Sequence, residues 1–182
     1  MPKPVPADAV LLAREHYLAG ERIDMQSLAA ELGISRTTLY RWVGDRETLI
    51  SGMLSEMVTE VIRDSIESAQ GEGMERTIDG MRCFTETSAS FSPLRHLVRT
   101  EPELALRVMI APGAGVSLTI CAELQREIGS TRPNWTAAKT AELADVITQV
   151  GMAYIWGNIA TDSEPDVDRA MRAMRMLLVA AD

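Results

Sequence analysis

Cysteine and histidine are scarce in this chain of 182 residues, which contains two of each. Cys83 and Cys121 are too few for a disulfide scaffold or a cysteine-rich zinc module, and we expect both thiols to be reduced in a cytosolic protein. His16 and His96 form no His-x-x-x-His pair, so the usual ligand set of a zinc site is missing. We therefore expect neither a metal ion nor a cofactor.

Long apolar runs are missing as well. The longest apolar stretch, residues 146–160, is interrupted by Thr148, Gln149 and Asn158, and it is shorter than the roughly 20 residues that a membrane span requires. The first ten residues, MPKPVPADAV, lack the uninterrupted apolar core of a secretory signal. We expect a soluble, cytoplasmic protein that does not interact with a membrane.

Catalytic motifs are also absent from the sequence. The segment GAGVS at 113–117 follows no strand pattern and lacks the third glycine of a phosphate-binding loop. A Gly-x-Ser-x-Gly nucleophile elbow does not occur. These absences favour a protein that is not an enzyme.

The 18 basic residues are outnumbered by 26 acidic residues, which gives a formal net charge of −8. Residues 1–50 contain 6 basic and 7 acidic side chains, so residues 51–182 contain 12 and 19 and hold a net charge of −7. This excess argues against a basic coat for indiscriminate nucleic-acid binding. It leaves room for a small basic reading head on an acidic body.

Helical periodicity dominates what is present. Apolar residues recur at spacings of three and four, and no Asn-Gly or Asp-Gly hairpin turn separates alternating runs. The clearest stripe runs from Leu49 to Ile66 and predicts a helix of about 20 residues. Further helices are expected over residues 8–22, 74–90, 93–100, 101–110, 116–128 and 135–159, and from Ser163, with Asp166 completing a capping box. The fold class is therefore all-α.

Residues 23–50, IDMQSLAAELGISRTTLYRWVGDRETLI, form the most informative pattern. Asp24 is placed to cap one helix and Ser35 to cap the next. Gly33 lies between them, where a left-handed turn favours glycine, and the small Ala29 permits a close helix crossing. This spacing is that of a helix-turn-helix, whose second helix enters the major groove of DNA.

The outer face of that second helix combines side chains suited to DNA recognition. Leu39, Trp42 and Val43 fall on its inner side, so hydroxyl, phenol and guanidinium groups face outward. Such groups can bond base edges and phosphates. The outward residues are Arg36, Thr37, Tyr40 and Arg41, with Thr38 at the edge.

The stretch LGISRTTLYRWVGDRETLI and the striped helix after it closely resemble the DNA-binding end of the TetR family of bacterial transcriptional regulators. The resemblance covers about residues 8–62, where the family commonly shows Gly-x-Ser-(Lys/Arg)-x-x-Leu-Tyr followed by (Lys/Arg)-Glu-x-Leu. The matching residues are Gly33, Ser35, Arg36, Thr38, Leu39, Tyr40, Arg46, Glu47 and Leu49. Within the family, AREHYLAG and LYRWVGDRETL are similar to regulators of quorum-signal or lactone degradation.

The resemblance implies a DNA site on the recognition helix and its flanks. Tyr40 and Arg46 would contact phosphates, with Arg46 at the start of the fourth helix, where the helix dipole attracts anions. Val43 replaces the family's frequent phenylalanine, and Gly44 replaces its frequent proline. The expected DNA-binding residues are Ser35, Arg36, Thr37, Thr38, Tyr40, Arg41 and Arg46.

We expect two domains, a DNA-binding helix-turn-helix over residues 1–46 and a helical ligand-binding and dimerisation domain over 47–182. One helix-turn-helix reads one half-site, so a homodimer is expected on a palindromic double-stranded operator. The helices at 135–159 and 163–180 are the candidates for pairing, with Gly151, Ala153 and Gly157 permitting close approach. Packing within one subunit is the competing interpretation.

The body is larger than holding two heads together requires, which favours a pocket for a small, mainly apolar effector. Its methionines suit an adaptable cavity, although they would serve equally well in an ordinary core. Arg95, His96 and Arg99 could supply a polar end for a carbonyl or carboxylate, or form a solvated helix face. The expected ligand-binding residues are Met81, Phe84, Phe91, His96, Met109 and Tyr154.

Three hypotheses of function remain open from the sequence. The first is a TetR-type repressor that an effector releases from its operator. The second is a helical-bundle enzyme or stress protein with a fortuitous helix-turn-helix. The third is a DNA-binding activator or architectural protein without a ligand.

Overall fold

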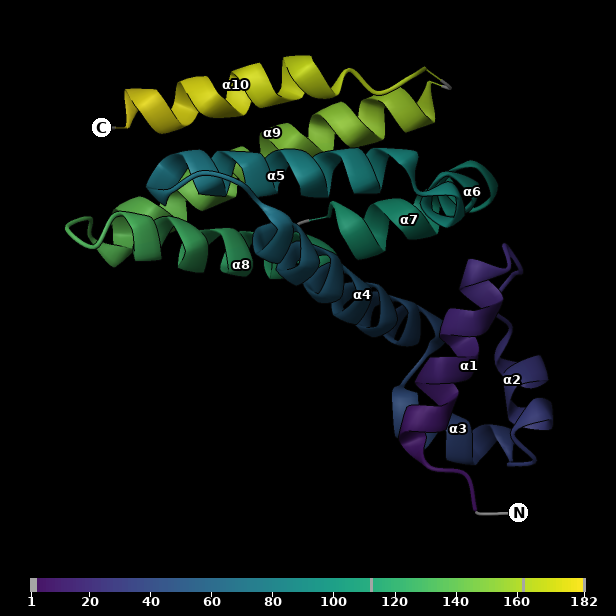
Figure 1. Ribbon diagram of the computed structural model, residues 1–182. Coiled ribbons are helices and arrows are strands. Elements are labelled where there is room, and N and C mark those ends of the chain that lie inside the picture. Colours follow the sequence, from purple (N-terminus) through teal and green to yellow (C-terminus); the bar gives the residue numbers. More distant parts are fainter. Residues whose placement is uncertain (1–2, 112, 162, 182) are drawn as a thin grey trace.

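The protein is all-helical, as the sequence predicts (Figure 1). The computed structural model describes residues 3–111, 113–161 and 163–181, and these ranges contain ten α-helices and no strand. The helices are α1 Pro6–Leu18, α2 Met25–Glu31, α3 Arg36–Val43, α4 Arg46–Ser68, α5 Gly73–Ser90, α6 Ser92–Thr100, α7 Pro102–Met109, α8 Gly115–Thr131, α9 Ala137–Ala160 and α10 Val167–Ala180.

Helices α1 to α3 form a small head at one end of the molecule, and α4 runs diagonally from the head into a larger helical body (Figure 1). The 23 residues of α4 span about 34 Å at roughly 1.5 Å per residue. Its first turns pack into the core of the head, where Leu49 and Ile50 are buried with Leu28 and Leu39. The same helix therefore belongs to the head at its start and to the body at its end.

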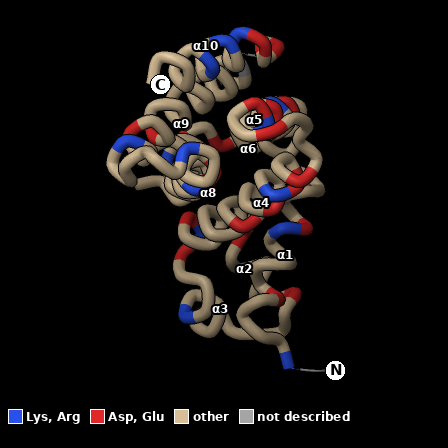
Figure 2. The backbone as a smooth tube through the Cα atoms, turned by 60° about the vertical axis from the view of Figure 1, so that its left-hand side comes forward, with Lys and Arg blue, Asp and Glu red and all other residues tan. Residues whose placement is uncertain are grey.

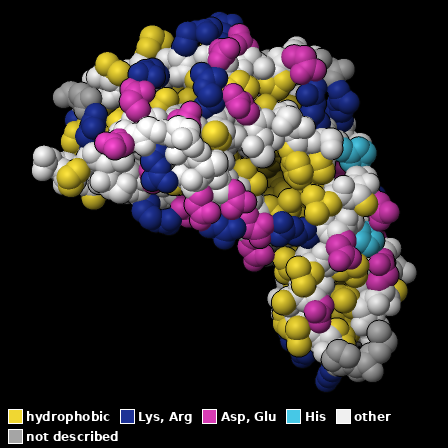
Figure 3. All heavy atoms as spheres, viewed as in Figure 1, with side chains coloured by type: hydrophobic (Ala, Val, Ile, Leu, Met, Phe, Trp, Pro, Cys, Tyr) yellow, Lys and Arg dark blue, Asp and Glu magenta, His cyan; other side chains and the backbone are white. Residues whose placement is uncertain are grey.

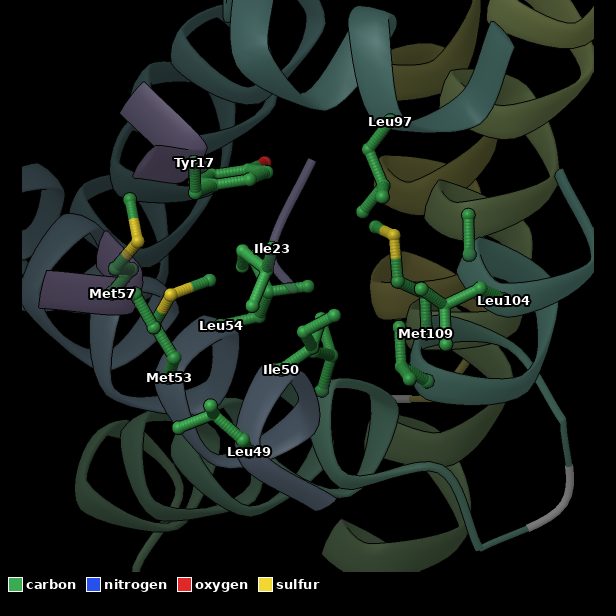
Figure 4. Close-up of a cluster of buried hydrophobic side chains, with 14 of the residues drawn as sticks. Tyr17, Ile23, Leu49, Ile50, Met53, Leu54, Met57, Leu97, Leu104 and Met109 are labelled. Atoms are coloured by element: carbon green, nitrogen blue, oxygen red, sulfur yellow. The ribbon is translucent and has the colours of Figure 1, made fainter. Parts of the chain in front are cut away.

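An apolar core joins the head to the body without a break. Tyr17 and Ile23 of the head lie in one buried cluster with Leu97 of α6 and Leu104 of α7 (Figure 4). The ring of Tyr17 stands 6.1 Å from the ring of Phe91, tilted by 55°. A movement of α6 or α7 would therefore disturb the head directly, because close-packed side chains transmit displacement.

A second core lies inside the body between α5, α8, α9 and α10. Ile78, Ile128, Ile147 and Leu178 are buried in it, one from each of these helices. The chain enters α10 differently from our expectation. Because α10 begins at Val167, its cap is Asp166, whose carboxylate accepts from the Arg169 amide at 2.9 Å.

The predicted capping box at the start of α10 is therefore wrong. Ser163 lies before the helix, and its hydroxyl bonds the Thr161 hydroxyl at 3.1 Å. Ser163 and Asp166 have the spacing of a capping box, which would start the helix at residue 164. The helix instead starts three residues later, at Val167.

Candidate DNA-binding surface and ligand cavity

Local capping builds the helix-turn-helix as the sequence predicts. The Asp24 carboxylate accepts from the amides of Gln26 and Ser27 at 3.0 and 2.9 Å at the start of α2. These hydrogen bonds, that from the Ser27 amide above all, lower the pKa of the Asp24 carboxyl. Gly33 then takes a φ of +65°, a left-handed conformation that costs glycine little. The chain thereby turns from α2 into α3 within four residues.

The Ser35 hydroxyl fixes the start of α3. It accepts from the Thr38 amide at 3.1 Å and shares a 2.8 Å hydrogen bond with the Thr38 hydroxyl. Both side chains were predicted to contact DNA. The structure gives both of them a capping role at the N-terminus of α3, and Thr38 is half-buried while Ser35 is exposed.

The outer face of α3 is open to solvent. Leu39 is fully buried beneath it, whereas Arg36, Thr37, Tyr40 and Arg41 are exposed, with 42% of Tyr40 accessible. Within the described residues, neither guanidinium on this face forms an ion pair. Four of the predicted DNA-binding side chains are thus together and free to meet a ligand.

Positive charge gathers at the end of the head that is remote from the body. Arg36 and Arg41 are the only charged residues between positions 32 and 44, so α3 holds a local charge of +2. The chain before α1, with the exposed Lys3, lies at the same end (Figures 1 and 2). Basic side chains also mark the tip of the head in the space-filling view (Figure 3). Lys3 is not among the residues expected to bind DNA, but its position before the first helix adds a positive charge to this end of the head.

Arg46 is turned away from this surface. Its Nε donates to the Ile23 carbonyl at 2.5 Å, and a terminal nitrogen donates to the Glu101 carboxylate at 2.6 Å. Both ionic side chains are about four-fifths buried. The phosphate contact expected of Arg46 is therefore not supported, because its guanidinium is already engaged between the head and the start of α7.

A cavity of about 70 Å³ lies in the body. Its walls come from the second half of α4 and from α5, α8, α9 and α10, and they include Met81 and Phe84 of α5, as the sequence predicts. Ile62 and Ile66 of α4 form another part of the wall. The helix that carries the head is therefore also a wall of the cavity.

The other four predicted ligand-binding residues lie elsewhere. Phe91 and Met109 pack in the core that joins head and body, and Met109 is buried there (Figure 4). Tyr154 packs against the second core with the Arg169 guanidinium 5.9 Å above its ring. His96 is exposed in a groove between head and body. These placements correct the predicted pocket, which combined residues of α5, α6, α7 and α9 that do not share one cavity.

Neither a metal-ligand group nor a membrane-spanning helix occurs in the described ranges. There, His, Cys, Asp and Glu side chains nowhere gather in the groups of three that could hold a metal ion. Among the same residues, no helix has both the length and the apolar character needed to cross a bilayer.

Comparison with known proteins identifies one matching family and two curated relatives. Residues 72–179 match the family described as Tetracyclin repressor-like, C-terminal domain. Two strains of Mycobacterium tuberculosis contain HTH-type transcriptional regulators, MT0489 and Rv0472c, that are each 34% identical to this chain over 74 residues. The match covers 39% of this chain and about a third, 32%, of the length of these curated relatives.

Solved structures share the fold over nearly the whole length. The transcriptional repressor QsdR of R. erythropolis, from the TetR family, superposes with a TM-score of 0.86 at 24% identity, covering 95% of this chain and 93% of that one. The TetR family repressor AlkX from Dietzia sp., implicated in biodegradation of n-alkanes, superposes with a TM-score of 0.69 at 22% identity, covering 100% of this chain and 97% of that one.

Proposed function

Because this chain belongs to the TetR family of transcriptional regulators, we propose that it is a repressor that binds a palindromic operator as a homodimer and is released by a small, mainly apolar effector. The observation that carries this proposal is the double role of α4, which packs into the head at Leu49 and Ile50 and lines the body cavity at Ile62 and Ile66. A regulator of this kind acts on the chromosome, so we expect it in the bacterial cytoplasm.

DNA recognition is assigned to the open face of α3. Arg36 and Thr37, in the first turn, are placed to reach base edges when α3 enters the major groove, and a guanidinium can bond guanine bidentately. Tyr40 and Arg41, one turn later, are suited to phosphates. The acidic body, with a net charge of −7 over residues 51–182, opposes DNA contacts outside the head.

Dimerisation is assigned to α9 and α10. Val146, Met176 and Val179 are large apolar residues that are 40, 67 and 65% exposed, and such side chains favour burial against a partner. Ala153 is exposed on α9, and Gly157 has open space above its backbone. Gly151 does not fit this role, because it lines the cavity and faces Met174 within its own subunit.

Release of DNA would follow from a change in α4. An effector in the cavity presses on Ile62 and Ile66, and α4 passes the displacement to the head. Two heads read successive major grooves only when their separation is about 34–36 Å. To change occupancy from 99:1 to 1:99 an effector must favour the displaced shape by about 5.5 kcal/mol.

The test is binding of the purified chain to DNA upstream of its own gene, followed by fluorescence anisotropy. We expect a dimer on an inverted repeat, and we expect the triple variant R36A/Y40F/R41A to lose operator affinity while remaining folded. Unchanged affinity in that variant would show that α3 is not the reading helix.

Dimerisation is tested separately by analytical ultracentrifugation. Ala153→Arg places a charge on the proposed interface and should yield a 20.0 kDa monomer. Ala30→Arg, at another exposed alanine, on α2, is the matched control and should leave the oligomer intact. A wild-type chain that is monomeric at micromolar concentration would overturn the homodimer.

A further inference from the structure

The charged residues that line the body cavity are all acidic. Isoleucine, methionine and other apolar side chains form most of its wall, and none of its lining residues is basic. Two carboxylates from α8, those of Glu123 and Glu127, contribute to the same wall. A carboxylate or phosphate in this cavity would meet like charge and no cation, which disfavours an anionic ligand strongly in a partly dry site.

The two carboxylates differ in their partners. Glu123 forms an ion pair with Arg126, a residue one turn along α8 whose side chain is 70% exposed. Glu127 accepts a hydrogen bond from the Thr77 hydroxyl at 3.3 Å. Glu123 is therefore paired with a cation of its own helix, whereas Glu127 keeps an uncompensated negative charge at the cavity wall.

One polar group in the cavity wall lacks a partner. Thr148 of α9 is only 3% exposed, and its hydroxyl is hydrogen-bonded to none of the described residues. Threonines inside helices commonly donate to the carbonyl four residues earlier, as Thr85 does to Met81 at 2.7 Å in the same cavity. The hydroxyl of this wall residue is thus buried and unpaired, a state in which few polar groups of folded proteins are left.

We propose that the cavity takes an uncharged, mainly apolar molecule whose oxygen function hydrogen-bonds to the Thr148 hydroxyl, and that Glu123 and Glu127 exclude the corresponding carboxylate. The oxygen is a hydroxyl or a carbonyl, because threonine can both donate and accept. This inference rests on the proposed function in one respect, since it takes the cavity to be the effector site.

The size of the cavity fixes the scale of the first probes. One water needs about 10–15 Å³ of such space, so the observed 70 Å³ admits roughly five to seven small groups. Six-carbon probes are of about this size. Hexan-1-ol, n-hexane, hexanoate and hexylammonium differ only in the end group and isolate its contribution.

The experiment titrates these four probes into the full-length chain at pH 7, without DNA, and follows the backbone amides by nuclear magnetic resonance. We expect hexan-1-ol to bind about tenfold more tightly than n-hexane, as one buried hydrogen bond allows. Hexanoate should bind at least tenfold more weakly than the alcohol. The double variant E123Q/E127Q should reduce the difference in affinity between hexan-1-ol and hexanoate.

Thr148→Val removes the hydroxyl and keeps the shape of the side chain. The variant should lose the tenfold preference for the alcohol while still binding n-hexane. It should also melt at a higher temperature than the wild type, because an unpaired buried hydroxyl is removed, so lost binding cannot be mistaken for unfolding. Thr140→Val is the control: Thr140 lies buried on the same helix outside the cavity, with its hydroxyl bonded to Ala137 at 3.0 Å.

Several results would overturn the inference. These are tightest binding by hexanoate or hexylammonium, an undiminished alcohol preference in Thr148→Val, and a failure of all four probes to bind. Operator binding is measured separately by anisotropy. If the probes bind in the expected order but the chain does not bind operator DNA, the proposed function is refuted and the cavity assignment stands. If the chain binds operator DNA but the probes bind in another order, the cavity assignment is refuted and the proposed function stands.

Discussion

Arg46 can have one of two roles: an external contact with a DNA phosphate or an internal ion pair with Glu101. Its side chain donates to the Glu101 carboxylate at 2.6 Å and to the Ile23 carbonyl at 2.5 Å. Hydrogen bonds to charged groups contribute about 1.5–3 kcal/mol when well formed. Because Arg46 and Glu101 keep 23 and 20% of their side-chain exposure, water weakens their attraction, and we expect about 1–2 kcal/mol for the pair. Arg22, 3.8 Å from Glu101 and 77% exposed, adds little.

Glu101→Gln and Arg46→Gln should therefore both destabilise the chain, and Arg46→Gln should cost more because it also removes the hydrogen bond to the Ile23 carbonyl. For a protein of this size, a loss of about 1–2 kcal/mol corresponds to a fall of roughly 2–8 °C in melting temperature. Urea denaturation of the two single variants and the double variant gives their coupling energy, which should be about 1 kcal/mol. A coupling energy near zero would show that the ion pair does not join the head to the body.

The same variants decide whether Arg46 touches DNA. A phosphate contact contributes about 0.9 to the slope of log affinity against log salt concentration. We expect Arg46→Gln and Glu101→Gln to leave this slope unchanged, since neither removes a phosphate contact. If Arg46→Gln lowers the slope by about 0.9 per subunit and Glu101→Gln does not, then Arg46 binds phosphate and our reasoning is refuted.

Three further predictions follow from the head and from the packing of α4. Arg36→Ala should cost about 1–3 kcal/mol of operator binding and relax base preference at one position; in anisotropy titrations with substituted operators, an equal loss on every sequence would assign a phosphate contact instead. A Cβ on Gly115 would lie 2.6 Å from the Ser51 Oγ, so Gly115→Val should lower stability to urea by about 1–3 kcal/mol through overpacking, and an unchanged urea midpoint would contradict this contact of α8 with α4. Backbone hydrogen bonds lower the pKa of the Asp24 and Asp45 carboxyls in the folded chain. The two ionised carboxylates therefore stabilise the fold fully above their unfolded pKa of about 4. This contribution is lost as the pH falls through their lower pKa values in the folded state. The non-titrating caps Asp24→Asn and Asp45→Asn should flatten the acid limb of the stability profile, and a limb as steep as that of the wild type would argue against this origin.

The head was predictable because its signals act over three or four residues. Asp24, Gly33 and Ser35 cap or turn the chain as expected, since capping and left-handed turns depend on neighbouring backbone groups. The burial of Leu39 and the exposure of Thr37 and Arg41, on the opposite side of α3, follow from helix geometry. The all-helical fold and the membership in a family of regulators were likewise evident from periodicity and motif.

The cavity was predictable only in part. Met81 and Phe84 were expected and line it, but Phe91 and Met109 pack at the head instead. Composition shows that apolar side chains are available. It does not give the rotation of each helix about its axis, which decides whether a side chain enters a cavity or a core. Thr148 was recognised in the sequence only as an interruption of an apolar run.

The sequence by itself determined the helices, the reading head and the face that it presents, because these depend on local propensity, capping and a period of 3.6 residues. Only the tertiary structure decided which distant residues meet. It joined Arg46 to Glu101 across 55 positions and left the Thr148 hydroxyl without a partner inside a wall built from five helices. Such contacts depend on how whole helices pack, and no short window of sequence contains both partners.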